Sequence, residues 1–297
     1  MIADETAGFA ERYGPWAVIA GGSEGVGAEF ARGLAERGVN VVLLARRQAA
    51  LDQVAAVIRD DTGVEVRSAM VDLAEDDAMA TIVAATDDID VGVLMYCAGA
   101  DPHYRHFLAE PIDTALSMVQ RNCVVPMRLC HHFAAPMVAR GAGAIVLVSS
   151  GGGLVGAPNM VAYGATKAFD MVMAEALWAE LHGQGVDVLG MVLGLTDTPA
   201  LRRLMVERGR LASVDDAVPG AASAATVAAG ALANLSNGPT WIAGDDVRAG
   251  FEHLGALPRN DAVRLMVQAA GGTMGDDTMG DDTKAGCRPH HAPDHQP

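Results

Sequence analysis

Aromatic and positively charged side chains are scarce in this sequence. Only 4% of its 297 residues are aromatic, and 21 lysines and arginines are outnumbered by 37 aspartates and glutamates, so the formal net charge is −16. So acidic a surface repels phosphate backbones and anionic lipids, which argues against nucleic-acid and membrane partners. A local cluster of basic residues in such a chain is correspondingly informative.

Long apolar runs and paired cysteines are also missing. No run approaches the roughly 20 residues that a membrane-spanning helix needs. The start of the chain, residues 1–16, lacks the basic region and the continuous apolar stretch of a secretory signal. The cysteines are scattered without a CxxC pair, which predicts free thiols. From these absences we expect a cytoplasmic protein.

The sequence does contain a regular alternation of apolar, β-branched segments with helical patterns. Such a chain is long enough for one large domain. Near-continuous apolar strands separated by helices indicate a parallel sheet that is covered on both faces. We therefore expect a single α/β domain over residues 1–271, a Rossmann-like doubly wound parallel sheet with helices on both faces. The predicted strands are 16–22, 39–45, 64–73, 91–99, 143–150, 186–194 and 239–244.

The last residues differ in composition from the rest. Residues 273–283 contain the pentad TMGDD twice, and few large apolar residues follow. A segment of this kind cannot bury enough apolar surface to offset the entropy of ordering, so 272–297 is predicted to be a disordered tail. Its potential soft-metal ligands do not form a closed, well-spaced set, and we expect no metal site. They are Cys287, His290, His291 and His295.

A glycine-rich loop, AGGSEGVG, follows the first predicted strand. Its glycines, Gly21, Gly25 and Gly27, follow the pattern G-x-x-x-G-x-G immediately before a helical segment. Glycines let the backbone approach a ligand closely, and a helix N-terminus offers free N–H groups to an anion. The loop therefore predicts a site for the pyrophosphate of a dinucleotide.

The ends of the second and third predicted strands bear on which dinucleotide binds. Arg46 and Arg47 stand where a ribose-binding carboxylate would end the second strand, and an arginine there favours the 2′-phosphate of NADP over NAD. The alternative is that both are ordinary surface cations, and Glu24 in the loop disfavours a second anion nearby. Asp72 is placed to meet the adenine amino group, or else simply caps the next helix.

The pentad YGATK places Tyr163 and Lys167 four positions apart, on one face of a predicted helix. An unperturbed tyrosine has a pKa of about 10 and is a poor base near neutral pH, but a neighbouring ammonium stabilises the phenolate. The pair can therefore move a proton at an alcohol oxygen. Taken singly, the tyrosine is also typical of a half-buried helix position and the lysine of a surface charge.

These motifs, in this order and spacing, resemble the short-chain dehydrogenase/reductase family. The resemblance covers roughly residues 14–245 and rests on the glycine loop, on Asn122 in VQRNCVVP, on Ser149-Ser150 and on YGATK. It implies a catalytic tetrad of Asn122, Ser150, Tyr163 and Lys167. In that tetrad the serine donates a hydrogen bond to the substrate oxygen, the lysine also binds the nicotinamide ribose, and the asparagine holds a water that links the lysine to solvent.

The resemblance also implies the cofactor site, with NADP(H) preferred and NAD as the alternative. Thr198, in LGLTDT, would hold the nicotinamide carboxamide. The chain departs from the family pattern at Ala20, Gly22, Cys97 and Leu193, and we interpret the cysteine as a small apolar substitute and not as a reactive thiol. The implied cofactor-binding residues are Gly21, Ser23, Gly25, Val26, Gly27, Arg46, Arg47, Asp72, Leu73, Ala98, Gly99, Tyr163, Lys167, Thr196 and Thr198.

The segments expected to frame the substrate are mainly apolar. We expect a lid over 199–214 and a hydrophobic ketone or secondary alcohol as substrate, interconverted with NADP(H). A 3-oxoacyl thioester reductase and a non-catalytic NADP(H)-sensing protein are the alternatives. The helix 163–182 carries an apolar stripe that either packs on the sheet or, as the resemblance implies, pairs subunits in a homodimer or homotetramer. The pocket residues are Leu154, Val155, Met160, Leu201, Leu204 and Met205, with His103 and Tyr104 as polar contacts.

Overall fold

A seven-stranded parallel sheet forms the centre of the molecule. The computed structural model describes the backbone of residues 2–101 and 103–273, and side chains within 8–101 and 103–269. The strand order is β3-β2-β1-β4-β5-β6-β9, with neighbouring strands parallel. The strands are β1 (Trp16–Ala20), β2 (Asn40–Ala45), β3 (Val66–Met70), β4 (Val91–Tyr96), β5 (Gly143–Ser150), β6 (Val186–Leu193) and β9 (Thr240–Ile242).

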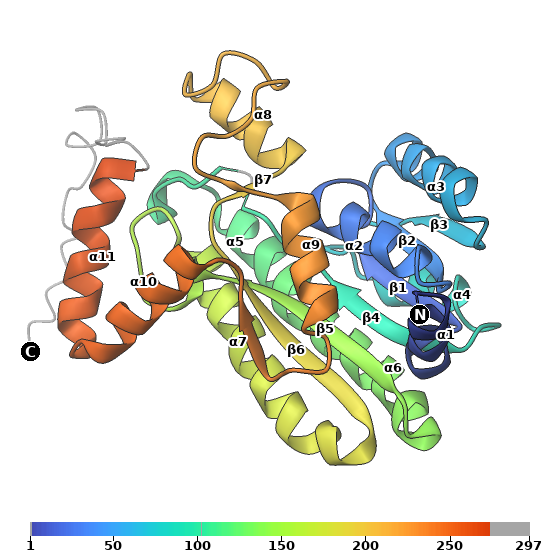
Figure 1. Cartoon of the computed structure of the whole chain (residues 1–297). Coiled ribbons are helices and arrows are strands. Elements are labelled where there is room, and N and C mark those ends of the chain that lie inside the picture. The colour runs from blue at the N-terminus through green and yellow to red at the C-terminus, as the bar shows by residue number, and fades with distance from the viewer. Residues whose placement is uncertain (1, 102, 274–297) are drawn as a thin grey trace, which may run out of the picture.

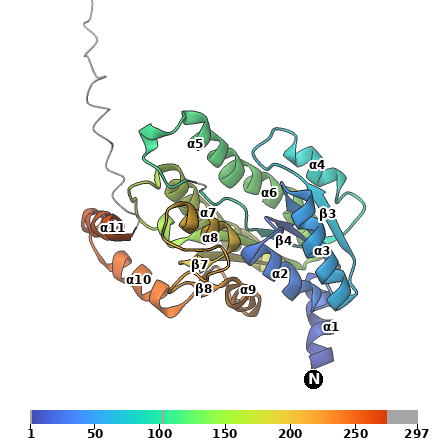
Figure 2. The same ribbon diagram turned by 90° about the horizontal axis from the view of Figure 1, so that it is seen from above.

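Helices cover both faces of this sheet, which confirms the predicted doubly wound α/β fold (Figures 1 and 2). One face carries α2 (Gly25–Ala35), α3 (Gln48–Thr62) and α9 (Ala224–Ala233). The other carries α4 (Ala78–Ala84), α6 (Val125–Arg140) and α7 (Val161–Leu181). The remaining helices are α1 (Ile2–Tyr13), α5 (Ile112–Val119), α8 (Pro199–Glu207), α10 (Asp245–Ala256) and α11 (Arg259–Thr273).

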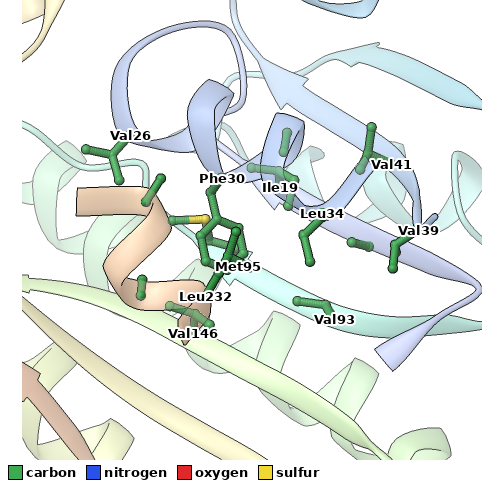
Figure 3. Close-up of a cluster of buried hydrophobic side chains, with 14 of the residues drawn as sticks. Ile19, Val26, Phe30, Leu34, Val39, Val41, Val93, Met95, Val146 and Leu232 are labelled. Atoms are coloured by element: carbon green, nitrogen blue, oxygen red, sulfur yellow. The ribbon is translucent and has the colours of Figure 1, made fainter. Parts of the chain in front are cut away.

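Alternating side chains of the central strands pack into the two halves of the core, one on each face of the sheet. In β1, Ala17 and Ile19 point to the face that carries α2, whereas Val18 points to the face that carries α6. Phe30 of α2 lies at the centre of the first cluster and is fully buried, with Leu232 of α9 beside it (Figure 3). Burial on both faces explains why the strands read as continuous apolar runs and not as alternating ones.

All seven predicted strands are present, most of them one to five residues shorter than their apolar runs. The helix α1 and the small two-stranded sheet of β7 (Thr196–Asp197) and β8 (Ala222–Ser223) were not predicted, because neither has a long apolar run. The predicted tail begins at 272, inside α11, and its residues 274–297 lie outside the described part of the chain. None of the described helices is long and apolar enough to cross a membrane.

The stripe on α7 does not pack on the sheet along its whole length. Ala165, Val172 and Ala176 are exposed, and Val172 is 59% exposed. The buried residues of α7 are small or polar, and Met173 and Leu177 of the stripe pack against the core beside them. These buried residues are Gly164, Thr166, Lys167, Asp170 and Ala174. Core packing is therefore not the explanation for the exposed part of the stripe.

Candidate active site

The glycine loop lies at the point where the strand order reverses, between β1 and β4. Gly21 has a φ of +91°, and a Cβ added to it would lie 2.9 Å from the backbone nitrogen of Ala98 after β4. A Cβ on Gly27 would lie 2.3 Å from the carbonyl oxygen of Gly21. Both positions therefore require glycine. Ligands of open α/β sheets bind in the crevice at such a reversal, beyond the carboxyl ends of the strands.

The N-terminus of α2 suits a phosphate ligand. Its N-cap residue, Glu24, makes no side-chain capping hydrogen bond, so the first N–H groups of this 11-residue helix are not satisfied by a side chain. The residues around the loop thus fit the pyrophosphate of a dinucleotide. Thr198 adjoins the loop, because its Cγ2 would lie 3.1 Å from a Cβ on Gly25. The loop after β1 and the chain after β6 therefore border one site.

Glu24 joins two arginines from different segments. Its carboxylate accepts hydrogen bonds from Arg47 at 2.6 Å and from Arg203 of α8 at 2.5 Å. Burial by itself raises the pKa of Glu24, but the hydrogen bonds and charges of Arg203 and Arg47 outweigh it and lower that pKa. This carboxylate therefore ties α8 to the glycine loop and occupies one of the two arginines that the sequence assigns to nucleotide selection.

The other predicted nucleotide residues follow the carboxyl ends of β2, β3 and β6. Arg46, at the end of β2, is exposed, and within the described residues it pairs with no carboxylate. Asp72 follows β3 and accepts a hydrogen bond from the Ala74 N–H at 3.0 Å, which closes a local turn; it does not cap α4, whose N-cap residue is Asp77. Thr198 caps α8 by accepting from Leu201 N–H at 3.2 Å, while the hydroxyl of Thr196 donates to Gly194 O at 3.2 Å.

Tyr163 and Lys167 lie one turn apart in the first half of α7. The side chain of Lys167 is almost completely buried, and its Nζ donates to Val148 O of β5 at 2.7 Å and to Asp170 Oδ2 at 3.0 Å. Burial would lower the pKa of Lys167, but Asp170 first, and then Tyr163, outweigh that effect and raise it. The lysine is thus a buried cation in electrostatic contact with the tyrosine.

Asn122 lies in a π-helical turn, Gln120–Val124, between α5 and α6. Its side chain is fully buried, and its amide donates to Gly99 O at 3.1 Å and to Thr166 Oγ1 at 2.9 Å. The Thr166 hydroxyl donates in turn to the backbone carbonyl of Tyr163 at 2.9 Å. The asparagine therefore connects the chain after β4 to the helix that carries the tyrosine. Local π-helical turns are frequent at functional sites.

The two serines at the end of β5 have different partners. Ser149 is buried and donates to Lys167 O at 2.6 Å, which anchors α7 to the strand. Ser150 accepts from the Gly152 N–H at 3.2 Å, so its own hydroxyl proton stays available. A Cβ on Gly152 would lie 3.6 Å from both Ser150 Oγ and Tyr163 Cε1, so these two side chains flank the same point.

A loop after β4 covers this site with a second tyrosine. The rings of Tyr104 and Tyr163 meet edge to face, with centroids 5.3 Å apart. Tyr104 has a φ of +47°, a conformation that residues other than glycine rarely adopt, and Asp101 stabilises it by accepting from the N–H groups of His103 and Tyr104. Arg208, which follows α8, donates to the carbonyls of both His103 and Tyr104, so the predicted lid is attached to this loop.

The structure thus brings the four predicted catalytic residues together, near the carboxyl ends of β4 and β5. Of the predicted pocket residues, Val155 is buried, whereas the others are partly exposed.

Sequence reasoning missed Asp170, which pairs with Lys167. A carboxylate three positions after the lysine on one helix is a signal for such a contact, because residues three apart are neighbours on a helix. It also missed the anchoring roles of Ser149 and Thr166. Within the described residues, no group of potential metal ligands occurs, and the tail residues for which we expect no metal site lie outside them.

Comparison with known proteins places the chain in a family. Residues 15–208 match the family described as short chain dehydrogenase. The chain is 37% identical over 191 residues to a 7β-hydroxysteroid dehydrogenase of Collinsella aerofaciens, a match that spans 64% of this chain and 72% of that protein. It is 32% identical over 259 residues to the enzyme of that name from Clostridium sardiniense, with 86% and 95% covered.

A different activity is named for another relative, the very-long-chain 3-oxoacyl-CoA reductase of Macaca fascicularis. It is 34% identical over 185 residues, which cover 61% of this chain and 59% of that protein. Among solved structures, one from a study of 7β-hydroxysteroid dehydrogenase stereoselectivity superposes with a TM-score of 0.79 at 31% identity, covering 87% of this chain and 98% of that one. A short-chain dehydrogenase from Sphingobium yanoikuyae in complex with NADPH superposes at 0.70 and 27% identity, with 90% and 99% covered.

Proposed function

Because this chain belongs to the short-chain dehydrogenase/reductase family and is an oxidoreductase acting on CH–OH groups, we propose that it interconverts a hydrophobic ketone and its secondary alcohol with NADP(H), and that its substrates are steroid-like. The observation that carries the chemistry is the arrangement of Tyr163 and the buried Lys167 ammonium beside Ser150. Support for the substrate class comes from the relatives named as 7β-hydroxysteroid dehydrogenases.

The cofactor preference rests on the basic end of β2. Arg46 is exposed at the carboxyl end of β2, and a guanidinium there suits the 2′-phosphate of NADP. The relative solved with NADPH supports the same choice. The glycine loop would receive the pyrophosphate at the N-terminus of α2, and the third N–H of Lys167, beyond those given to Val148 and Asp170, would reach the nicotinamide ribose.

The chain's own residues would handle the proton. When bound, NADPH supplies the hydride that reduces the carbonyl carbon. Tyr163 gives its hydroxyl proton to the carbonyl oxygen as that oxygen gains charge, and the Lys167 ammonium stabilises the resulting phenolate. Ser150 donates a hydrogen bond to the same oxygen. Asn122 keeps α7 in register with the chain after β4 through Thr166. Alcohol oxidation reverses each transfer.

The experiment that tests this proposal is a panel of steroids, aromatic ketones, aliphatic ketones and acyl thioesters, each followed by NADPH consumption. We expect turnover of steroid ketones that disappears in the Tyr163→Phe variant. If the protein turns over none of these compounds and still binds NADPH tightly, the non-catalytic nucleotide-sensing alternative would be favoured instead.

A 3-oxoacyl thioester reductase is the second candidate, and the relative named very-long-chain 3-oxoacyl-CoA reductase favours it. A carrier protein would be acidic, and the charge of −16 opposes docking unless basic residues gather locally. Arg203 and Arg208 lie in or next to α8, but both already have partners, Glu24 and the loop after β4. This candidate would be excluded if the enzyme reduces free ketones but reduces neither carrier-bound thioesters nor CoA thioesters.

The exposed apolar side chains of α5 and α7 support a homodimer or homotetramer. The two helices pack beside each other, and their exposed residues form a face that a second copy of the chain could cover. Analytical ultracentrifugation of the wild-type protein and of a Leu116→Lys variant tests this. We expect dissociation in the variant. The residues of this face are Ile112, Leu116, Val119, Val161 and Val172.

A further inference from the structure

The carboxylate beside the Lys167 ammonium is itself buried. Asp170 follows Lys167 by three positions on α7, and its side chain is 2% exposed, compared with 5% for the lysine side chain. One carboxylate oxygen, Oδ2, lies 3.0 Å from Lys167 Nζ. The other, Oδ1, is buried, and no hydrogen-bond donor among the described residues reaches it. Two charges in such a place are costly unless they are paired with each other.

The pairing also leaves an unsatisfied polar atom in the core, which a packing residue of similar size would avoid. An aspartate is thus a poor choice for stability at position 170, where α7 faces the sheet. Its one strong contact leads directly to the lysine that lies beside Tyr163. Perturbed, buried ionisable groups of this kind are concentrated at functional sites.

We propose that Asp170 is a positioning residue for the reaction: its carboxylate holds the Lys167 ammonium between α7 and β5 and, by its negative charge, sets the pH at which the Tyr163–Lys167 pair releases its proton. The inference rests on the proposed function of Tyr163 and Lys167. Asp170 touches neither substrate nor cofactor in this role, and it acts through the lysine alone.

The direction of the effect follows from charge. With the tyrosine and lysine protonated, the three side chains together are neutral, and loss of a proton leaves a net negative charge in a buried place. Without the carboxylate the same pair is positive, and loss of the proton leaves it neutral. Proton release is therefore easier without Asp170, whichever of the two residues gives up the proton.

The other titratable groups around Asp170 do not supply a competing charge of comparable strength. Burial raises the pKa values of the three thiols and of the Tyr96 phenol, so these groups stay neutral at physiological pH. Arg121 is a cation nearby, and its charge acts on Tyr96. The groups facing the Lys167–Asp170 pair are Tyr96 and Cys97 from the end of β4, Cys123 from the π-helical turn, Cys130 from α6 and Tyr163 from α7 itself.

The test is the pH dependence of the Asp170→Asn variant, which removes the charge and keeps the shape. Ketone reduction needs the protonated tyrosine and falls as pH rises, whereas alcohol oxidation rises over the same range. The falling limb of the reduction profile and the rising limb of the oxidation profile are the two limbs of this pH dependence. We expect both limbs of the variant to move to lower pH by about one unit or more. An Asp170→Glu variant, which keeps the charge, should retain the wild-type limbs. If the asparagine variant does not fold, Asp170→Ser takes its place with the same expected shift.

A matched control separates this effect from loss of stability. Asp187 on β6 is also buried and ion-paired, with Arg12 at 2.7 Å, and it also accepts from the hydroxyl of Tyr13. We expect Asp187→Asn to lower the melting temperature and to leave both limbs where they are. Unmoved limbs in the Asp170→Asn and Asp170→Ser variants, with rates merely reduced, would overturn the proposal and assign Asp170 a structural role.

A second readout does not depend on finding a substrate. Ultraviolet difference titration, with each protein compared with its own Tyr163→Phe version, reports ionisation of this one tyrosine. We expect its midpoint to fall in the Asp170→Asn variant. A shifted midpoint in a protein that turns over no ketone would refute the proposed function but still show that Asp170 sets the ionisation of Tyr163, whereas an unshifted midpoint would refute the inference itself.

Discussion

The ring of Tyr104 meets the ring of Tyr163 edge to face at a centroid distance of 5.3 Å and an interplanar angle of 68°. The two residues are far apart in sequence, and Tyr104 comes from a loop that is held by Asp101 on one side and by Arg208 on the other. Burial, followed by the charge and a hydrogen bond of Tyr163, raises the pKa of Tyr104 above its ordinary value. Tyr104 therefore stays protonated and cannot act as the base.

This contact predicts different results for two substitutions of Tyr104. Tyr104→Phe keeps the ring pair and loses only the hydrogen bond to Tyr163, so we expect kcat/KM to fall less than in Tyr104→Ala. Tyr104→Ala removes a contact worth about 1 kcal/mol, so kcat/KM for a bulky ketone should fall about fivefold. Steady-state kinetics at several pH values measures both. A phenylalanine variant as inactive as Tyr163→Phe would show that the Tyr104 hydroxyl itself takes part in catalysis.

Replacing Arg46 by aspartate should change cofactor choice. The substitution removes a guanidinium from the proposed 2′-phosphate site and adds a repelling charge, so we expect the Kd of NADPH to rise by about tenfold or more. NADH lacks that phosphate and should lose far less. Fluorescence titration with both cofactors measures the ratio. Arg264→Asp makes the same charge change on α11 and is the control. Equal losses of NADPH and NADH affinity in Arg46→Asp would contradict the assignment of Arg46 to the 2′-phosphate site.

Glu24 competes with the cofactor for Arg47, because its carboxylate already lies 2.6 Å from that guanidinium. We expect Glu24→Gln to bind NADPH about threefold to tenfold more tightly, since the arginine is released and a nearby negative charge is gone. Isothermal titration calorimetry measures the change. Weaker binding in this variant would mean that Glu24 is needed to orient Arg47 toward the phosphate.

The same carboxylate makes the stability of the glycine loop depend on pH. The pKa of Glu24 is lowered in the folded protein, so its contribution to stability is present above the ordinary value of 4.5 and is lost as pH falls through the lowered one. The melting temperature of the wild type should thus exceed that of Glu24→Gln near pH 7, and the gap should close in acid. Differential scanning fluorimetry across this range checks the sign, and a gap that widens in acid would contradict it.

The three described cysteines should react slowly with alkylating reagents. Burial raises the pKa of Cys97 and of Cys123 to about 11 and that of Cys130 to about 12. At pH 8 a thiol of pKa 11 is ionised in about one molecule in a thousand, and the thiolate is the reactive form. Peptide mass spectrometry should therefore find these residues unlabelled by iodoacetamide in the native protein and labelled after unfolding. Rapid native labelling of Cys97 would show a reactive thiol and not an apolar substitute.

The sequence by itself determined where the strands lie along the chain, the glycine loop at Gly21 and the one-turn spacing of Tyr163 and Lys167, because each of these depends on local features. Apolar runs, glycine dihedrals and the four-residue spacing of a helix act over one or two turns of chain. These local features stay the same whichever segments pack against them.

Other relationships were decided only by the tertiary structure. Glu24 occupies Arg47 and holds α8 through Arg203, and Tyr104 reaches Tyr163 through a loop that no periodicity describes. Asp170 and Lys167 are close in sequence, but the strength of their interaction depends on their burial against β5. That burial arises only when the sheet and its helices pack together. A side chain's partners across the fold depend on how layers from distant segments meet, and a linear pattern carries no information about the low dielectric that makes those contacts strong.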